Sequence, residues 1–182
     1  MTVGQDAEFS LERFSSRYKG ELGNDFGNLV SRLLHMCHQY FEGTAPEPEL
    51  NEELEKKLQT RWEEVSAKTL DLYQTYHFHQ ALEETIGFVR AINKYADERA
   101  PWKLAKSDAP EDKKALATSL ATMLEGLRLA NELLAPVMPG AHAKICHCLG
   151  QEPAQTWAGR LVWSECLSGI KLGEKTILFP RD

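Results

Sequence analysis

The chain has 182 residues, of which 42% are hydrophobic and 26% charged, the proportions of a single globular domain that can bury a core. These values exclude an intrinsically disordered chain, a collagen-like chain and a cysteine-dense secreted scaffold. The formal net charge of −6 argues mildly against a generic nucleic-acid-binding protein, since such proteins are usually basic. Most of this charge is local, because residues 42–64 hold eight acidic and three basic side chains. Other faces can therefore approach a polyanion without strong repulsion.

The sequence of the N-terminal half predicts four helices, at residues 10–19, 24–41, 51–76 and 78–99. Apolar residues recur in them at three- and four-residue steps, the spacing of one helix face. Ser10 is the expected N-cap of the first helix and Gly20 its stop. A proline-containing loop is expected at residues 44–50. Pro101 ends the fourth helix, because the residue before a proline avoids the helical region.

The C-terminal half begins with an expected connector at residues 101–110 and a helix at 111–134. Prolines then interrupt the chain before a shorter helix at 141–149. In residues 151–182, glycines separate short apolar segments, which predicts a loop-rich tail or a hairpin. We therefore predict an all-α fold, in which residues 1–182 form one bundle of about five to six helices with this tail.

The cellular compartment can be predicted from what the sequence contains. No run of about 18 apolar residues is long enough to cross a bilayer, and the acidic N-terminal residues lack the apolar core of a signal peptide. The chain has four cysteines, Cys37, Cys146, Cys148 and Cys166. In a chain without a signal peptide, four cysteines are typical of a protein whose thiols stay reduced. We expect a cytoplasmic protein that does not contact a membrane.

Metal binding is suggested by His142, Cys146, His147 and Cys148, which lie close together in sequence. In a helix, Cys146 and Cys148 point about 200° apart, whereas His142 and Cys146, at i and i+4, share one face. Two ligands fall short of the four of a structural zinc site, so we expect no metal. Glycine-rich phosphate loops and nucleophile elbows do not occur, so no catalytic residue and no cofactor are expected.

A polar stripe runs along the second expected helix. Asn28, Arg32, His35 and Gln39 are spaced by four, three and four residues, so they share one helix face. The ordinary interpretation is a solvated face, which every amphipathic helix has. The functional interpretation is that an amide and a guanidinium one turn apart present hydrogen-bonding groups to a base edge or a phosphate.

The segment Ala100-Pro101-Trp102-Lys103 follows the fourth expected helix. An aromatic side chain just beyond a helix end can be partly exposed. Exposed aromatic rings are stacking platforms for unpaired bases, and each stacked base contributes about 1–3 kcal/mol. The alternative is that Trp102 packs the connector onto the bundle, since tryptophan buries a large area in cores.

Several short strings follow one another in a fixed order: NDFGNLVSR (24–32), YFEG (40–43), AL (81–82), NKY (93–95), APW (100–102), AK (105–106), LLAPVMP (133–139) and LFPR (178–181). Together they resemble the anticodon-binding helical domain of methionyl-tRNA synthetase, a class I synthetase. The resemblance spans about residues 5–181.

The resemblance implies an all-α domain that recognises the CAU anticodon of methionine tRNAs in protein synthesis, with tRNA and not DNA as its partner. In that family the Asn and Arg of the first string and the Trp of the APW string hold the first anticodon base. This implies the same role for Asn28, Arg32 and Trp102, with Pro101 shaping the connector. Aromatic stacking combined with base-edge hydrogen bonds is also how proteins generally recognise unpaired RNA bases.

No string resembles the family's catalytic half. The chain alone is therefore expected not to activate methionine, and a synthetase catalytic domain is expected as a partner in cis or in trans. Two other functions remain open: a protein-docking bundle without tRNA specificity, and a complete small enzyme. Comparing CAU with scrambled anticodon loops tests the first, and amino-acid-dependent pyrophosphate exchange tests the second.

Overall fold

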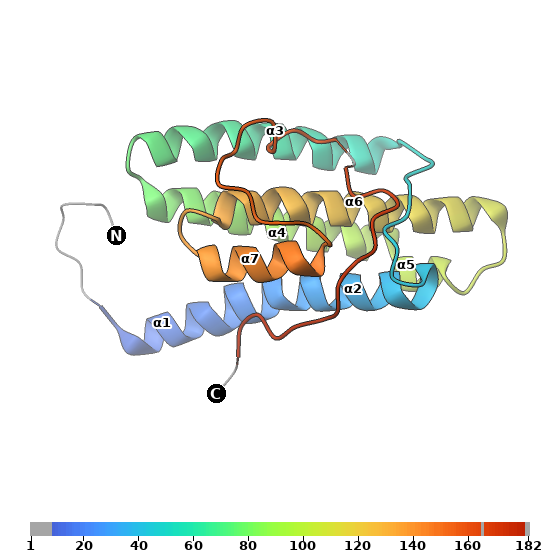
Figure 1. The fold of residues 1–182 in the computed structure, drawn as a ribbon, viewed down its shortest axis with the longest axis horizontal. Helices are drawn as coiled ribbons and strands as arrows, with labels where there is room; N and C mark the ends of the chain where they lie inside the picture. The colour runs from blue at the N-terminus through green and yellow to red at the C-terminus, as the bar shows by residue number, and fades with distance from the viewer. Residues whose placement is uncertain (1–8, 165, 181–182) are drawn as a thin grey trace.

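Helix α6 (Pro110–Leu134) is the central element of the structure, a computed structural model that describes residues 9–164 and 166–180. Its last nineteen residues are all buried, as expected for a helix enclosed by neighbours. It packs against α4 (Phe78–Arg99), which in turn pairs with α3 (Glu53–Gln74). On its other side lie α2 (Asn28–Phe41) and α7 (Pro139–Cys148) (Figure 1). The predicted all-α bundle is confirmed.

The N-terminal helices form one continuous rod, so the expected stop at Gly20 is wrong. Helix α1 (Leu11–Arg17) passes directly into a π-helical segment, η1 (Tyr18–Gly27), and then into α2 (Figure 1). A glycine ends a helix by adopting a left-handed conformation with positive φ, and Gly20 does not adopt one. The chain instead widens into π geometry, which often occurs at functional sites.

The end of α2 is where the sequence predicts it. Glu42 and Gly43 both have positive φ, at 52° and 72°, and the Gly43 N–H donates to the Cys37 carbonyl at 3.1 Å. A Cβ at Gly43 would lie 2.5 Å from the His38 Nδ1. A side chain at Gly43 would displace the His38 ring, so glycine suits this turn, which ends α2 and starts the loop to α3.

The connector after α4 contains a helical turn that the sequence did not predict. Pro101–Leu104 form the short helix α5, and α6 then begins at Pro110. Proline is favoured at the first position of a helix because its missing N–H has no helical partner to lose. The same preference starts α7 at Pro139, two residues earlier than expected.

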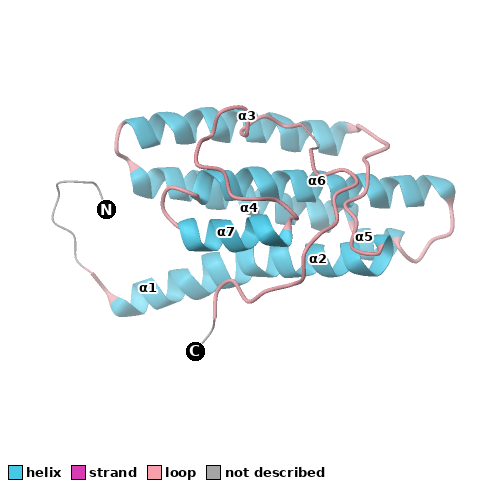
Figure 2. Ribbon diagram, viewed as in Figure 1, coloured by secondary structure: helices cyan, strands magenta, loops and turns pink. Residues whose placement is uncertain are grey.

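The tail after α7 is loop-rich, and the described part of it contains no strand or hairpin (Figure 2). Buried polar side chains of α6 hold the tail in place through hydrogen bonds. Arg128 pairs with Glu125 at 2.6 Å and donates to the carbonyls of Arg160 and Val162 at 2.7 and 2.8 Å. The Ser164 N–H donates to Glu125 at 2.9 Å. These hydrogen bonds give backbone N–H and C=O groups of the tail the partners that neighbouring strands provide in a sheet.

The tail also pairs with the loop that follows α2. The Ala45 N–H donates to the Ile170 carbonyl at 2.9 Å, the Gly169 N–H donates to Ala45, and Thr44 forms an isolated bridge with Lys171. The tail therefore closes the bundle over α6 and beside α2. Among the described helices, none combines the length and apolar character needed to cross a membrane.

Candidate functional site

The start of α2 is fixed in place by contacts with α4. The Arg90 Nε donates to the Asp25 carboxylate at 2.8 Å, and the Asn93 amide donates to the Asp25 carbonyl at 2.9 Å. The hydrogen bond to Asp25 raises the pKa of Arg90, so the guanidinium stays charged. These bonds hold the backbone three residues before Asn28, the first residue of α2. Asn28 and Arg32, one turn apart, are both exposed.

The predicted polar stripe faces solvent. His35 and Gln39 are exposed as well, whereas the opposite side of α2 is buried in the core through Leu29, Leu33 and Met36. The helix is thus held by its apolar face, and its polar face is free for contacts with another molecule.

Trp102 is positioned by a sharp turn between α4 and α5. Ala100 has the left-handed conformation (φ 47°, ψ 57°), and its N–H caps α4 by donating to the Ala96 carbonyl at 2.9 Å. A non-glycine residue in this conformation costs about 1–2 kcal/mol. Pro101 follows as the first residue of α5 and is buried. The turn therefore ends one helix, starts another and fixes where the indole lies.

The structure brings Trp102 and Arg32 together. The Arg32 guanidinium carbon lies 5.2 Å from the centroid of the Trp102 ring, within the range of a cation–π interaction. Trp102 is partly buried and packs against the core. The ring therefore packs the connector onto the bundle, as the alternative interpretation expects, and it also adjoins the polar stripe.

A shallow hollow of about 380 Å³ lies between the start of α2 and α4. It is lined by Asn24, Asp25, Asn28, Arg32, Arg90, Asn93, Lys94 and Asp97. Trp102 lies outside this lining, and Arg32 connects the hollow to the indole. Arg90, Lys94 and Asp97 are not among the site residues that the sequence predicts, although Lys94 belongs to the NKY string. Their spacing beside Asn93 on one side of α4 is the signal that places them together.

A buried network supports the turn that carries Trp102. Glu55 of α3 accepts hydrogen bonds from the Tyr95 hydroxyl at 2.5 Å and from two Arg99 nitrogens at 2.9 and 2.5 Å. Arg99 also contacts Glu52 at 2.9 Å. Burial raises the pKa of Glu55, but the hydrogen bonds from Arg99 and Tyr95 outweigh it, so the pKa lies below its usual value. Arg99 immediately precedes Ala100, so this network fixes the end of α4.

No cluster of potential metal ligands adjoins this surface in the part of the chain that the structure describes. The one such cluster found there consists of Glu132, His142 and Cys146, between α6 and α7. The surface around Arg32 and Trp102 offers hydrogen-bond donors, acceptors and an aromatic ring. These groups suit a planar, polar ligand such as an unpaired base.

Comparison with known proteins shows the same architecture in one family. The family model for the anticodon binding domain of methionyl tRNA ligase matches residues 42–179. Methionine–tRNA ligase of Streptomyces coelicolor is 36% identical over 100% of this chain and 35% of its own length. The enzyme of Caldanaerobacter subterraneus is 35% identical over 98% of this chain and 28% of its own length.

Among solved structures, apo methionyl-tRNA synthetase of Mycobacterium tuberculosis superposes with a TM-score of 0.91 at 31% identity, over 100% of this chain and 37% of that one. The chain thus spans about a third of the length of these relatives. Pro101 and Trp102 lie within the range matched by the family model, whereas Asn28 and Arg32 precede it and lie only within the whole-chain matches. With three quarters of its residues matched by that model, the chain belongs to the family of anticodon-binding domains of methionyl-tRNA ligases.

Proposed function

We propose that this chain binds the CAU anticodon loop of methionine tRNAs, and that Asn28, Arg32 and Trp102 together hold the first anticodon base. The observation that carries the proposal is the 5.2 Å contact between Arg32 and Trp102. It joins an aromatic platform to the exposed guanidinium and amide of α2. Family membership supports the same partner, because the matched model is that of an anticodon-binding domain.

The chemistry of these side chains suits cytosine. A cytosine edge presents one donor, its exocyclic amine, and two acceptors. Arg32 has only donors and Asn28 has both kinds of group, so the pair can complement this edge. The indole face supplies the stacking surface, which contributes about 1–3 kcal/mol per base.

Binding requires Arg32 to move. Its guanidinium lies over the indole, where the base would stack. We infer that the base replaces the guanidinium on the ring, and that Arg32 turns to the edge of the same base. The contact between the two side chains also holds Arg32 close to its proposed target.

The longer relatives are named as ligases, so the attachment of an amino acid to tRNA is an activity of those longer proteins. The chain covers about a third of their length, and its described residues hold no cluster that resembles a reaction centre. We propose that it acts with a catalytic domain, in cis or in trans, in the cytoplasm, and that alone it does not activate methionine.

The test is direct binding of labelled anticodon stem–loops, measured by fluorescence anisotropy at one stated salt concentration, since phosphate contacts make RNA affinity strongly salt-dependent. We expect the CAU loop to bind more tightly than a loop with the same bases in scrambled order. Asn28→Ala should reduce this difference. Gln39→Ala is the matched control, because Gln39 is exposed on the same stripe of α2 but farther along the helix. Equal affinity for both loops would instead support a docking module without tRNA specificity.

A further inference from the structure

We propose that α6 and α7 form a zinc site whose ligands are Glu132, His142 and Cys146. Each residue offers one ligand atom, and these three atoms lie within 4.8 Å of one another. All three residues are at least 97% buried. Nitrogen, sulfur and carboxylate oxygen are the ligands that zinc prefers in proteins.

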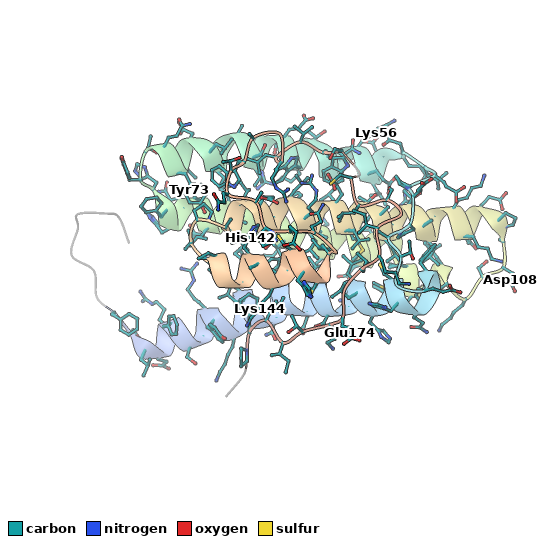
Figure 3. The ribbon with its side chains drawn as sticks, in the orientation of Figure 1. Lys56, Tyr73, Asp108, His142, Lys144 and Glu174 are labelled. Atoms are coloured by element: carbon teal, nitrogen blue, oxygen red, sulfur yellow. The ribbon has the colours of Figure 1, made fainter. Side chains whose placement is uncertain are left out.

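The pair on α7 already has the spacing of two zinc ligands. His142 and Cys146 lie one turn apart on the same face, and the Cys146 Sγ is 3.6 Å from the His142 Nε2. In a tetrahedral site with ordinary zinc–sulfur and zinc–nitrogen bonds, these atoms are roughly 3.5 Å apart. Figure 3 shows His142 on the side of α7 that faces α6, while Lys144 projects from the opposite side. An ion between the helices therefore requires little movement of this pair.

The orientation of His142 is set by a backbone group. Its Nδ1 lies 3.0 Å from the Asn131 carbonyl, and because a carbonyl only accepts, the proton must be on Nδ1. The lone pair of neutral His142 is then on Nε2, on the side of Cys146. Metal-binding histidines are commonly oriented in this way, by donating their other N–H to a carbonyl.

Asn131 also contributes to the surroundings of the sulfur. Its amide nitrogen lies 3.4 Å from the Cys146 Sγ, a donor that stabilises a thiolate ligand. Its side-chain oxygen is buried and has no hydrogen-bond partner among the described residues. A buried acceptor without a partner is costly, and a cation beside it would remove that cost. We infer that this oxygen or a water molecule completes the coordination of the ion.

Glu132 uses only one of its two oxygens in its hydrogen bonds with Arg160. Arg160 donates to it twice, at 2.8 and 2.5 Å, and both bonds go to the same oxygen, Oε1. The other oxygen, Oε2, can bind the metal. Zinc binding forms a zinc–sulfur bond and releases the thiol proton of Cys146 to solvent.

This cluster differs from the expectation of no metal that the sequence supports. The sequence shows only the pair on α7, since the third ligand lies on another helix. The site is also separate from the surface around Trp102, which is formed by α2, α4 and α5. Its test therefore does not depend on whether the surface around Trp102 binds an anticodon.

The experiment titrates the purified chain with zinc alone against a chromophoric chelator, and with cobalt to detect thiolate-to-metal charge transfer. We expect one metal per chain in the wild type, and an unfolding midpoint that rises with zinc and returns after chelation, since a ligand that binds the folded state stabilises it. The proposal is overturned if the wild type does not bind one metal per chain or if its unfolding midpoint does not rise with zinc.

Two ligand variants and one control locate the ion. His142→Asn keeps a donor near the Asn131 carbonyl but removes Nε2, and Cys146→Ser removes the sulfur. We expect both to lose the one-to-one binding and the charge-transfer band. Cys148→Ser should keep both, because this buried thiol instead lies 3.4 Å from the Glu174 carbonyl. Circular dichroism confirms that each variant folds. Unchanged metal binding in folded His142→Asn and Cys146→Ser places the metal elsewhere and also overturns the proposal.

Discussion

The guanidinium of Arg32, on α2, lies 5.2 Å from the ring centre of Trp102, on α5. Two segments far apart in the sequence thus meet at one exposed surface. In the proposed anticodon site the two side chains act on the same base, so their substitutions should not act independently. Residues in contact show interaction energies, and since both side chains would hold one base, a double variant is expected to lose less affinity than the sum of the two single losses.

Replacing Trp102 with alanine should weaken binding of the CAU stem–loop by about 5- to 150-fold, the equivalent of losing one base–aromatic stacking interaction. Trp102→Phe should retain much of the affinity, because phenylalanine preserves a stacking face. Anisotropy titrations measure both. If Trp102→Ala binds the loop as tightly as the wild type, the indole is only an anchor for the connector.

Arg32→Lys distinguishes base recognition from simple charge attraction. Lysine keeps the positive charge but lacks the planar fork that can pair with a base edge. We expect the affinity to fall by about tenfold or more, the equivalent of losing one good base-edge pairing. The dependence of affinity on salt should stay unchanged, since that slope reports phosphate contacts.

Lys103→Ala supplies the contrast to Arg32→Lys. Lys103 is exposed on α5 beside Trp102, and its loss should flatten the salt dependence if it meets a phosphate. Selectivity for CAU over the scrambled loop should stay the same. A salt slope that instead changes on Arg32→Lys would assign Arg32 to the RNA backbone.

The sequence predicts the helices well, because their apolar periodicity and their proline and glycine boundaries are local signals. It also predicts the polar stripe, since Asn28 and Arg32 are related by helical spacing alone. The sequence does not show that Arg32 reaches Trp102, because that contact depends on how α2 and α5 pack. Glu125 and Arg128 resemble solvated helix charges in the sequence, yet the irregular tail buries them. Because the tail has no apolar periodicity, the sequence does not indicate which side chains of α6 it covers.

Glu55→Gln should destabilise the fold. Glu55 is 2% exposed and accepts bonds from Tyr95 and Arg99, so the change weakens a buried charged network. Arg99 retains its contact with the exposed Glu52, so we expect a loss of about 1–3 kcal/mol in the free energy of unfolding. Urea denaturation measures it. Glu64→Gln is the matched control on the same helix, since its exposed pair with Arg61 should contribute at most about 1 kcal/mol.

The same carboxylate should make stability depend on pH. The pKa of Glu55 in the folded protein lies below its ordinary value of 4.5, so the unfolded chain binds the proton more readily. The stabilisation is therefore present above about pH 4.5 and is lost as the pH falls through the folded-state pKa. Urea midpoints at a series of pH values should show the wild type and Glu55→Gln converging in acid. A constant difference between them would contradict this assignment.

Arg128→Met should release the tail from α6. The substitution removes bonds to two tail carbonyls and leaves Glu125, which is 1% exposed, without its ion-pair partner. Removing one member of a buried pair costs about 3–5 kcal/mol. Limited proteolysis should cut first within residues 151–164. Adding Glu125→Gln should recover part of the stability, and Lys144→Met, an exposed change, should have little effect.

The methyl group of Ala100 has a consequence for how the indole is presented. Its left-handed backbone (φ 47°) would suit glycine better, by about 1–2 kcal/mol. Glycine, however, would allow this joint many other conformations in solution. Alanine lowers the folding free energy but restricts the angles through which the indole can swing. In the proposed function, the ring would therefore keep its place while Arg32 moves aside for the base.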